Sequence, residues 1–217
     1  MALIIRNARI EDAGIVAGCV LSAIGYDVYS KEGKNETLEL GDTAIKVSDA
    51  LDIFAQICAR EETLYSYTRA KVAELDGLAA GVLVSYPGEE NARLREKTWG
   101  LAMAAAVGSD SPASSEFIKN APAECKADEY YLDSLAVLPE FRGMSFEYAG
   151  SSGRLGHLLL TDGILAGRAK GFTRTSLIVD VSKSKLERYY ASLGFRTESE
   201  LLFFGHPYHR MVLYSNR

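Results

Sequence analysis

The sequence predicts an α/β (α+β) fold in which helices flank a mixed central sheet. Short apolar runs typical of strands alternate with longer segments whose apolar residues recur at helical spacing. Two of these runs, residues 67–75 and 78–86, are joined by Asp76-Gly77, which is a strong hairpin signal. A later run, residues 176–181, is mostly apolar, as expected for a strand buried beside a parallel partner.

The N-terminal part begins with a predicted strand and an amphipathic helix. Residues 3–6 form a short apolar run. Glu11 and Asp12 follow it, where acidic side chains favour the start of a helix dipole. Apolar residues then recur at helical spacing as far as Gly25, and a second helix is predicted from about residue 49 to 60.

The elements after the hairpin continue the alternation of helices and strands. They are predicted as a helix over about 92–107, a strand over 130–137, a helix over 155–168, a strand over 176–181, a helix over 183–193, and strands over 201–204 and 210–214. Gly194 marks the end of the last helix, because glycine commonly terminates helices.

Composition limits the classes of protein to consider. The chain has 217 residues, 24 basic against 29 acidic, and a net charge of −5, which argues against a nucleic-acid surface. The three cysteines, Cys19, Cys58 and Cys125, lie far apart in the sequence and form no C-x-x-C pair. No zinc site or disulfide framework is therefore predicted. The N-terminal apolar run is too short for a signal peptide, and no run reaches the roughly 18 apolar residues of a membrane span. We therefore expect a cytoplasmic protein with no metal and no nucleic-acid or membrane partner.

Three segments, about 26–47, 108–128 and 143–152, interrupt the alternation and are interpreted as insertions. The first is polar and irregular, and it is a candidate substrate-facing loop that contains Tyr26, Tyr29, Lys31 and Lys34. A solvated surface insertion explains the same composition equally well. The second opens with a stretch rich in glycine, serine and proline, which is typical of a flexible loop.

The strand over residues 130–137 and the elements that follow it form an arrangement suited to an anion. Pro139 comes directly after the strand, Arg142 and Gly143 follow, and the helix over 155–168 comes next. A strand, a loop and a helix in this order aim backbone N–H groups at a bound anion.

Two blocks of sequence resemble the GCN5-related N-acetyltransferases. The stretch from Leu135 to Gly143 is similar to the cofactor motif "LAVxPxxRG" that ends the fourth strand in that family. The segment from Leu177 to Phe195 resembles a second block of the family. The resemblance implies one N-acetyltransferase domain over residues 1–217, with a central sheet that splays between its fourth and fifth strands. It also implies acetyl-CoA as co-substrate, direct transfer of the acetyl group to a primary amine in a ternary complex, and a homodimer as a frequent assembly.

The same resemblance implies which residues bind acetyl-CoA. In the family, backbone groups freed at a bulge in the fourth strand hold the pantetheine arm, and a glycine loop wraps the pyrophosphate. The corresponding residues here are Leu135, Ala136, Val137, Arg142, Gly143, Gly153, Arg154, Leu155 and Gly156. The loop is irregular, because residues 143–152 intervene and Arg154 stands where the family usually has glycine. Either the insertion loops out and 153–156 still cradle the pyrophosphate, or the loop is remodelled and binding is weakened.

Catalytic roles are also carried over from the family. Tyr190 stands four residues before the glycine of Gly194-Phe195, where the family commonly has the tyrosine that protonates the departing thiolate. A tyrosine that merely packs near the sheet would look the same. Glu129, at the start of the strand over 130–137, is the first candidate for the base, and Asp133 shares its face by alternation. Asp133 equally suits a role in ordering the fold.

Other features leave alternatives open. His157, His206 and His209 are each more typical of structural histidines than of catalytic ones. The family often has an asparagine before the helix over 183–193, and the sequence here has Ser182-Lys183-Ser184 instead. A non-catalytic acyl-CoA-binding protein of the same fold, acting as a sensor or structural domain, is therefore the alternative function, and a longer acyl-CoA is an alternative co-substrate. The acceptor amine cannot be identified from the sequence.

Overall fold

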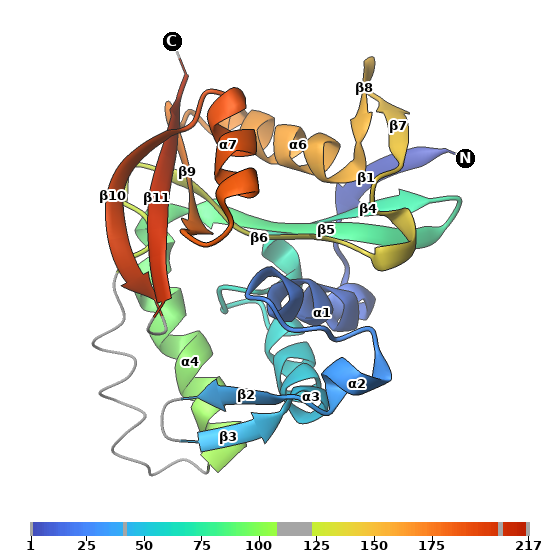
Figure 1. Ribbon diagram of the computed structural model, residues 1–217, viewed down its shortest axis with the longest axis vertical. Helices are drawn as coiled ribbons and strands as arrows, with labels where there is room; N and C mark the ends of the chain where they lie inside the picture. The colour runs from blue at the N-terminus through green and yellow to red at the C-terminus, as the bar shows by residue number, and fades with distance from the viewer. Residues whose placement is uncertain (1, 41–42, 108–122, 204–205, 216–217) are drawn as a thin grey trace.

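The computed structural model describes residues 2–40, 43–107, 123–203 and 206–215 of the chain. The predicted flexible loop over 108–115 lies outside the described residues. A seven-stranded sheet runs through the centre, in the order β1-β4-β5-β6-β9-β11-β10 (Figure 1). Its strands are β1 Leu3–Asn7, β4 Ala70–Leu75, β5 Leu78–Pro87, β6 Tyr130–Val137, β9 Arg174–Asp180, β10 Arg196–Phe203 and β11 His206–Tyr214. Neighbouring strands pair antiparallel except β6 and β9, which pair parallel. The predicted mixed sheet is confirmed.

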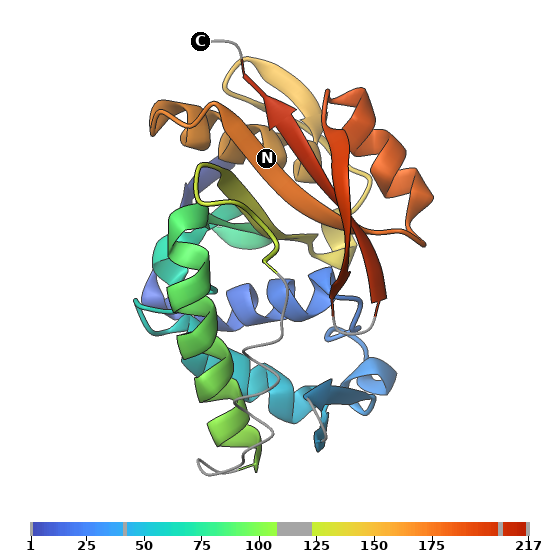
Figure 2. The same ribbon diagram turned by 90° about the vertical axis from the view of Figure 1, so that its left-hand side faces the viewer.

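Helices cover both faces of the sheet. On one face α1 (Ala13–Ala23) packs against β5 and β6, α3 (Val47–Cys58) packs on α1, and α4 (Asn91–Val107) packs on α3. Figure 2 shows these three helices on one side of the sheet. The other face carries α6 (Leu155–Ala169) and α7 (Ser184–Ser192). α1 is apolar almost all round, because it lies between the sheet and α3.

The remaining elements are short. They are α2 Lys31–Lys34, the hairpin of β2 Thr37–Leu40 and β3 Thr43–Lys46, the hairpin of β7 Ser145–Tyr148 and β8 Ser151–Arg154, and the 3-10 turns Ile10–Asp12, Tyr67–Arg69, Gly88–Glu90 and Pro139–Phe141. No described helix is both long enough and apolar enough to cross a membrane.

The sheet splays between β6 and β9, the fourth and fifth strands of the sheet in chain order. These strands pair only at Tyr130 with Thr175 and at Tyr131 with Ser176, so they diverge toward their C-terminal ends. The divergence coincides with a β-bulge in β6. There Leu132 and Ser134 pair with two consecutive residues of β5, so Asp133 between them has no partner residue in that strand. The predicted splay is therefore confirmed.

Glycines bring α6 unusually close to the sheet. A Cβ atom added to Gly163 would lie 2.4 Å from Leu83 Cδ2, and one added to Gly167 would lie 2.7 Å from Tyr130 Cδ1. Gly167 therefore needs to be glycine for the helix to approach β6, whereas at Gly163 the added atom would meet the end of the Leu83 side chain. This packing fixes the N-terminus of α6 beside the end of β6.

Several boundaries differ from the sequence-based prediction. The segment 26–47 is not irregular throughout, because it contains α2 and the β2–β3 hairpin. The first helix starts at Ala13, after a 3-10 turn, rather than at Glu11. The last two strands are longer than predicted, because pairing between β10 and β11 extends over polar residues that carry no apolar signal.

Candidate active site

An outer cavity of about 740 Å³ opens where β6 ends, between that strand, the start of α6 and α7. Every residue predicted to bind the cofactor lines it, except Ala136. The side chain of Ala136 points to the opposite face of the sheet and packs in the core beneath α1. The role proposed for Ala136 concerns its backbone and stays a prediction. Residues from the two separate blocks of sequence thus meet around one cavity.

The insertion over 143–152 loops out from this cavity. Most of it forms β7 and β8, and the second strand ends at Arg154, directly before the first residue of α6. Ala149 and Gly150 both have positive φ angles, 49° and 78°, as the two central residues of a type I′ hairpin turn require. The helix therefore starts where the sequence predicts, and 153–156 remain at the wall of the cavity.

The rim of the outer cavity is basic and offers backbone donors. Arg154 is the N-cap residue of α6, and the first N–H groups of a helix have no acceptor within the helix. Arg142, on the same wall, donates a hydrogen bond from Nε to the carbonyl oxygen of Val137 at 2.8 Å. Two exposed guanidinium groups and a helix N-terminus together suit a phosphate.

A smaller wedge cavity, of about 90 Å³, lies within the splay itself. Asp133 lines it from β6, Val179 from β9 and Tyr190 from α7. Tyr190 also lines the outer cavity, as do Leu135 and Leu186, so the two cavities adjoin. Burial raises the pKa of Tyr190 to about 12, so its phenol stays protonated at neutral pH.

Tyr189 and His157 form a polar pair on the wall of the outer cavity. Their Oη and Nδ1 atoms are 3.0 Å apart, and both residues line the cavity. The sequence made His157 more typical of a structural histidine than of a catalytic one. Neither residue type nor helical spacing shows that α6 and α7 place these two groups together.

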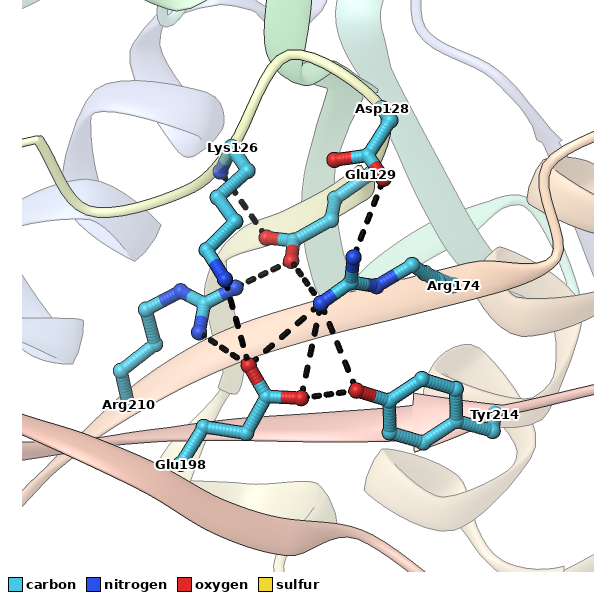
Figure 3. A network of polar contacts seen from close by, with 7 residues as sticks. All are labelled: Lys126, Asp128, Glu129, Arg174, Glu198, Arg210 and Tyr214. Atoms are coloured by element: carbon cyan, nitrogen blue, oxygen red, sulfur yellow. Dashed lines mark hydrogen bonds and ion pairs between the residues drawn. The ribbon is translucent and has the colours of Figure 1, made fainter.

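Glu129 does not line any of the cavities described here. It is fully buried, it accepts a hydrogen bond from the backbone N–H of Lys126 at 2.9 Å, and it pairs with Arg174 at 3.3 Å and with Arg210 (Figure 3). It directly precedes Tyr130, where β6 and β9 are still paired, so it lies at the closed end of the splay. Its carboxylate is thus paired with two arginines at the closed end of the splay, and its role as base stays a prediction.

The ion pairs of Glu129 belong to a larger network that holds the closed end together. Glu198 of β10 pairs with Arg210 at 2.9 Å and with Arg174 at 3.4 Å, and it also contacts Tyr214 (Figure 3). Hydrogen bonds from Tyr214 and Arg210 lower the pKa of Glu198 to about 2. β9, β10 and β11 are thereby tied to the segment that leads into β6.

Asp133, unlike Glu129, lines the wedge cavity. It is partly buried at the bulge and accepts hydrogen bonds from Tyr86 Oη at 2.5 Å and from Ser134 Oγ at 2.8 Å. Nearby, Glu124 accepts a hydrogen bond from Tyr131 Oη at 2.8 Å. Burial raises the pKa of both Asp133 and Glu124. A carboxylate whose pKa lies nearer neutrality, at a cavity wall opposite a protonated tyrosine, can exchange protons with a ligand there.

A third cavity, the lower cavity, of about 330 Å³, lies on the face of the sheet that α1 covers. Tyr26, which follows α1, lines it together with Phe54 of α3, Trp99 of α4 and Tyr208 of β11. Tyr208 also lines the wedge cavity. The lower cavity therefore lies next to the wedge cavity at Tyr208.

Comparisons with known proteins agree with this geometry. No family model and no curated protein matches the chain. Solved structures match almost all of it. An acetyltransferase superposes with a TM-score of 0.70 at 26% identity, over 98% of this chain and 100% of that chain. An N-acetyltransferase from Staphylococcus aureus Mu50 gives 0.68 at 22% identity, over 97% and 100% of the two chains. The PaiA N-acetyltransferase from Thermoplasma acidophilum, solved in complex with coenzyme A, gives 0.53 at 15% identity, over 99% of each chain.

Proposed function

We propose that this chain, which belongs to the GCN5-related N-acetyltransferase family, transfers the acetyl group of acetyl-CoA to a primary amine. The observation that carries the proposal is the splay of β6 from β9, with the predicted cofactor residues around the cavity at its open end. The likeness of the whole chain to acetyltransferases supports it.

The residues around the outer cavity fit acetyl-CoA. Leu135, Val137 and Leu193 form an apolar wall suited to the pantetheine arm, and Arg142 and Arg154 suit the pyrophosphate beside the start of α6. A Cβ atom added to Gly156 would lie 3.6 Å from Val137 Cγ2, so the first turn of α6 lies against the end of β6. The T. acidophilum relative, which was solved with coenzyme A, supports this cofactor.

Tyr190 is proposed as the acid. Bound acetyl-CoA would supply a thioester, whose C–S bond breaks as a C–N bond to the amine forms. Tyr190 keeps its proton at neutral pH, as any phenol does, and burial raises its pKa further. The residue lines both the outer and the wedge cavity. Donation of that proton to the departing sulfur neutralises the charge that develops there.

Asp133 is proposed as the base in place of Glu129. A protonated amine must lose a proton before it can act as a nucleophile, and Asp133 lines the wedge cavity that Tyr190 also lines. The hydroxyls of Tyr86 and Ser134 orient its carboxylate. Acid and base thus lie on opposite walls of the same small cavity.

Direct transfer is favoured over a covalent acetyl-enzyme. The three cysteines are all buried, and burial raises the pKa of each thiol. The thiolates that would be needed as nucleophiles are therefore disfavoured. We propose a ternary complex in which the amine attacks acetyl-CoA directly.

A calorimetric titration with acetyl-CoA tests the cofactor half of the proposal. We expect selective binding over a nicotinamide dinucleotide, and weaker binding to the Gly156→Asp variant, because a negative charge is introduced beside the pyrophosphate. A titration without heat would refute the proposal. Binding without acetyl transfer to any amine in a panel would favour the non-catalytic acyl-CoA-binding protein, and tighter binding of longer acyl-CoAs would favour a different co-substrate.

A further inference from the structure

A buried chain of three polar side chains ends at the proposed base. Asn91 Nδ2 donates a hydrogen bond to Tyr86 Oη at 3.2 Å, and Tyr86 Oη donates one to Asp133 Oδ2 at 2.5 Å. Asn91 and Tyr86 are 3% and 1% exposed, whereas Asp133 lines the wedge cavity. The chain therefore connects the first residue of α4 to the wall of the proposed reaction centre.

A tight turn between β5 and α4 places Asn91 next to Tyr86. The turn is the 3-10 segment Gly88–Glu90, and α4 begins directly after it. The N–H of Gly88 donates to the carbonyl oxygen of Glu129 at 2.7 Å, and a Cβ atom added to Gly88 would lie 2.0 Å from the carbonyl oxygen of Lys126. The turn thus needs glycine to lie against the segment that leads into β6. This contact fixes where α4 starts, and Asn91 can reach back to Tyr86.

The chemistry of the three groups determines where the hydroxyl proton of Tyr86 lies. A hydroxyl carries one proton, which rotates about the C–O bond. The amide nitrogen of Asn91 can only donate, so the Tyr86 proton cannot turn toward it and points to Asp133 instead. With the amide turned the other way, Tyr86 would face two acceptors with a single proton. The two hydrogen bonds therefore run in the same direction, and each polarises the next.

We propose that Asn91 is a positioning residue for the base, and that it acts through Tyr86 to keep the hydroxyl proton of Tyr86 on the carboxylate of Asp133. A hydrogen bond that is donated to the charged form of a carboxyl stabilises that form. Asn91 thus helps to keep Asp133 ionised and ready to accept a proton. The inference rests on the proposed function, because the role of Asp133 as base belongs to that function.

Other titratable groups lie around Asp133, and most of them are neutral where it titrates. Burial raises the pKa of the nearby thiols and phenols, which are Cys19, Cys125, Tyr65, Tyr131, Tyr190 and Tyr208. Burial also raises the pKa of Glu124, and further than that of Asp133. On the wall of the wedge cavity, hydrogen bonds from Ser182 lower the pKa of Asp180, which keeps its negative charge, and Lys183 adds a positive one. The titration of Asp133 can therefore be followed in mildly acidic solution.

Asn91→Leu tests the proposal, because leucine keeps the shape of asparagine and removes the donor. Two quantities are measured: the acidic limb of the pH profile of kcat/KM, and the NMR titration of the Asp133 carboxyl carbon, whose signal is the one missing from Asp133→Asn. We expect both to move to higher pH by about half a unit, about threefold in the ionisation constant, because the carboxylate loses stabilisation. In a Tyr86→Phe background, Asn91→Leu should cause no further shift, since the connection to Asp133 is already broken.

Thr98→Val is the matched control in the same helix. Thr98 is fully buried and accepts a hydrogen bond from the N–H of Leu64 at 2.8 Å, so its loss should lower stability without moving either titration. The proposal is overturned if Asn91→Leu leaves the titration of Asp133 unchanged, or shifts it equally in the Tyr86→Phe background. If Asn91→Leu does not fold, Asn91→Ala is measured in the same way. Failure of both to fold would make Asn91 a purely structural residue and would also overturn the proposal.

The NMR titration separates this inference from the proposed function, because it does not depend on acetyl transfer. A shift that requires Tyr86, in a protein that transfers no acetyl group to any amine, would refute the proposed function and leave the positioning of Asp133 by Asn91 standing. Acetyl transfer by a protein in which Asn91→Leu does not shift the titration of Asp133 would refute the inference and leave the function standing.

Discussion

At the residue scale, the two groups proposed to move protons differ in how their surroundings change their pKa. Burial raises the pKa of the Tyr190 phenol, which is protonated at neutral pH in any case, and it raises the pKa of the Asp133 carboxyl toward neutrality. Active sites commonly shift the pKa values of their acid and their base through burial and neighbouring groups. Both groups can be tested by single substitutions that preserve shape.

Tyr190→Phe should lower kcat by about 100-fold, because it removes the proton donor and keeps the ring. The dissociation constant for acetyl-CoA should change little, since the ring still lines the outer cavity. Steady-state kinetics and calorimetry measure the two quantities. Tyr189→Phe is the matched control and should retain most of kcat. Equal activity of wild type and Tyr190→Phe would exclude Tyr190 as the acid.

Asp133→Asn should lower kcat by about 100-fold and remove the acidic limb of the pH profile of kcat/KM. In the wild type this limb should lie above the usual aspartate pKa of roughly 4, because burial raises the pKa of Asp133 and protonation abolishes the base.

Ser134→Ala provides the sharper test of Asp133. The Ser134 hydroxyl stabilises the charged carboxylate and so lowers its pKa. Its removal should move the acidic limb to higher pH while the carboxylate remains. If the acidic limb stays at the same pH in Ser134→Ala, or is still present in Asp133→Asn, then it reports the titration of a group other than Asp133.

At the scale of elements, the position of α6 decides whether the outer cavity exists. The helix N-terminus meets the end of β6 because glycines let the helix lie directly on β5 and β6. The β7–β8 hairpin carries the inserted residues away from this junction. The insertion therefore changes the length of the connection without displacing the helix.

Gly167→Ala should lower the free energy of unfolding by about 1–3 kcal/mol, because the new methyl group would overlap the Tyr130 ring. Urea denaturation measures this change. Gly100→Ala in α4 is the control: a Cβ atom there meets nothing within 4 Å, and alanine should stabilise the helix by up to about 1 kcal/mol. The same sign of change in both variants would mean that α6 does not lie as close to the sheet as described.

At the scale of the whole molecule, the sheet is closed at one end and open at the other. The network around Glu129 holds β9, β10 and β11 to the start of β6, and the splay opens from there toward the cavities. These ion pairs hold the strands together at the closed end, from which the walls that carry Asp133 and Tyr190 diverge.

Glu129→Gln should lower the free energy of unfolding by about 1–3 kcal/mol, since it removes a buried anion from Arg210 and Arg174, which keep Glu198 as their partner. The activity of the protein that remains folded should be retained, because Glu129 is not the base in the mechanism proposed here. Urea denaturation and kinetics below the transition test both points. Asp128→Asn removes an exposed partner of Arg174 and should change stability by less than about 1 kcal/mol. Loss of activity in fully folded Glu129→Gln would restore Glu129 as a catalytic candidate.

The sequence by itself predicted the fold class and the order of the elements, and it supplied the residues proposed here to bind the cofactor and to act as the acid. These depend on local signals: apolar periodicity, the Asp76-Gly77 turn, and short motifs whose residues are neighbours in the chain. The start of α6 at Leu155 followed from the same kind of signal, despite the insertion before it.

Only the tertiary structure gave a reason to propose Asp133 rather than Glu129 as the base, and only it revealed the lower cavity. Alternation places both carboxylates on one face, but it cannot say which end of β6 stays paired with β9 or where a bulge lies. Likewise, Tyr26, Phe54, Trp99 and Tyr208 are distant in sequence and meet only when the helices and β11 pack. Such long-range contacts leave no local pattern, because each residue satisfies only the periodicity of its own element.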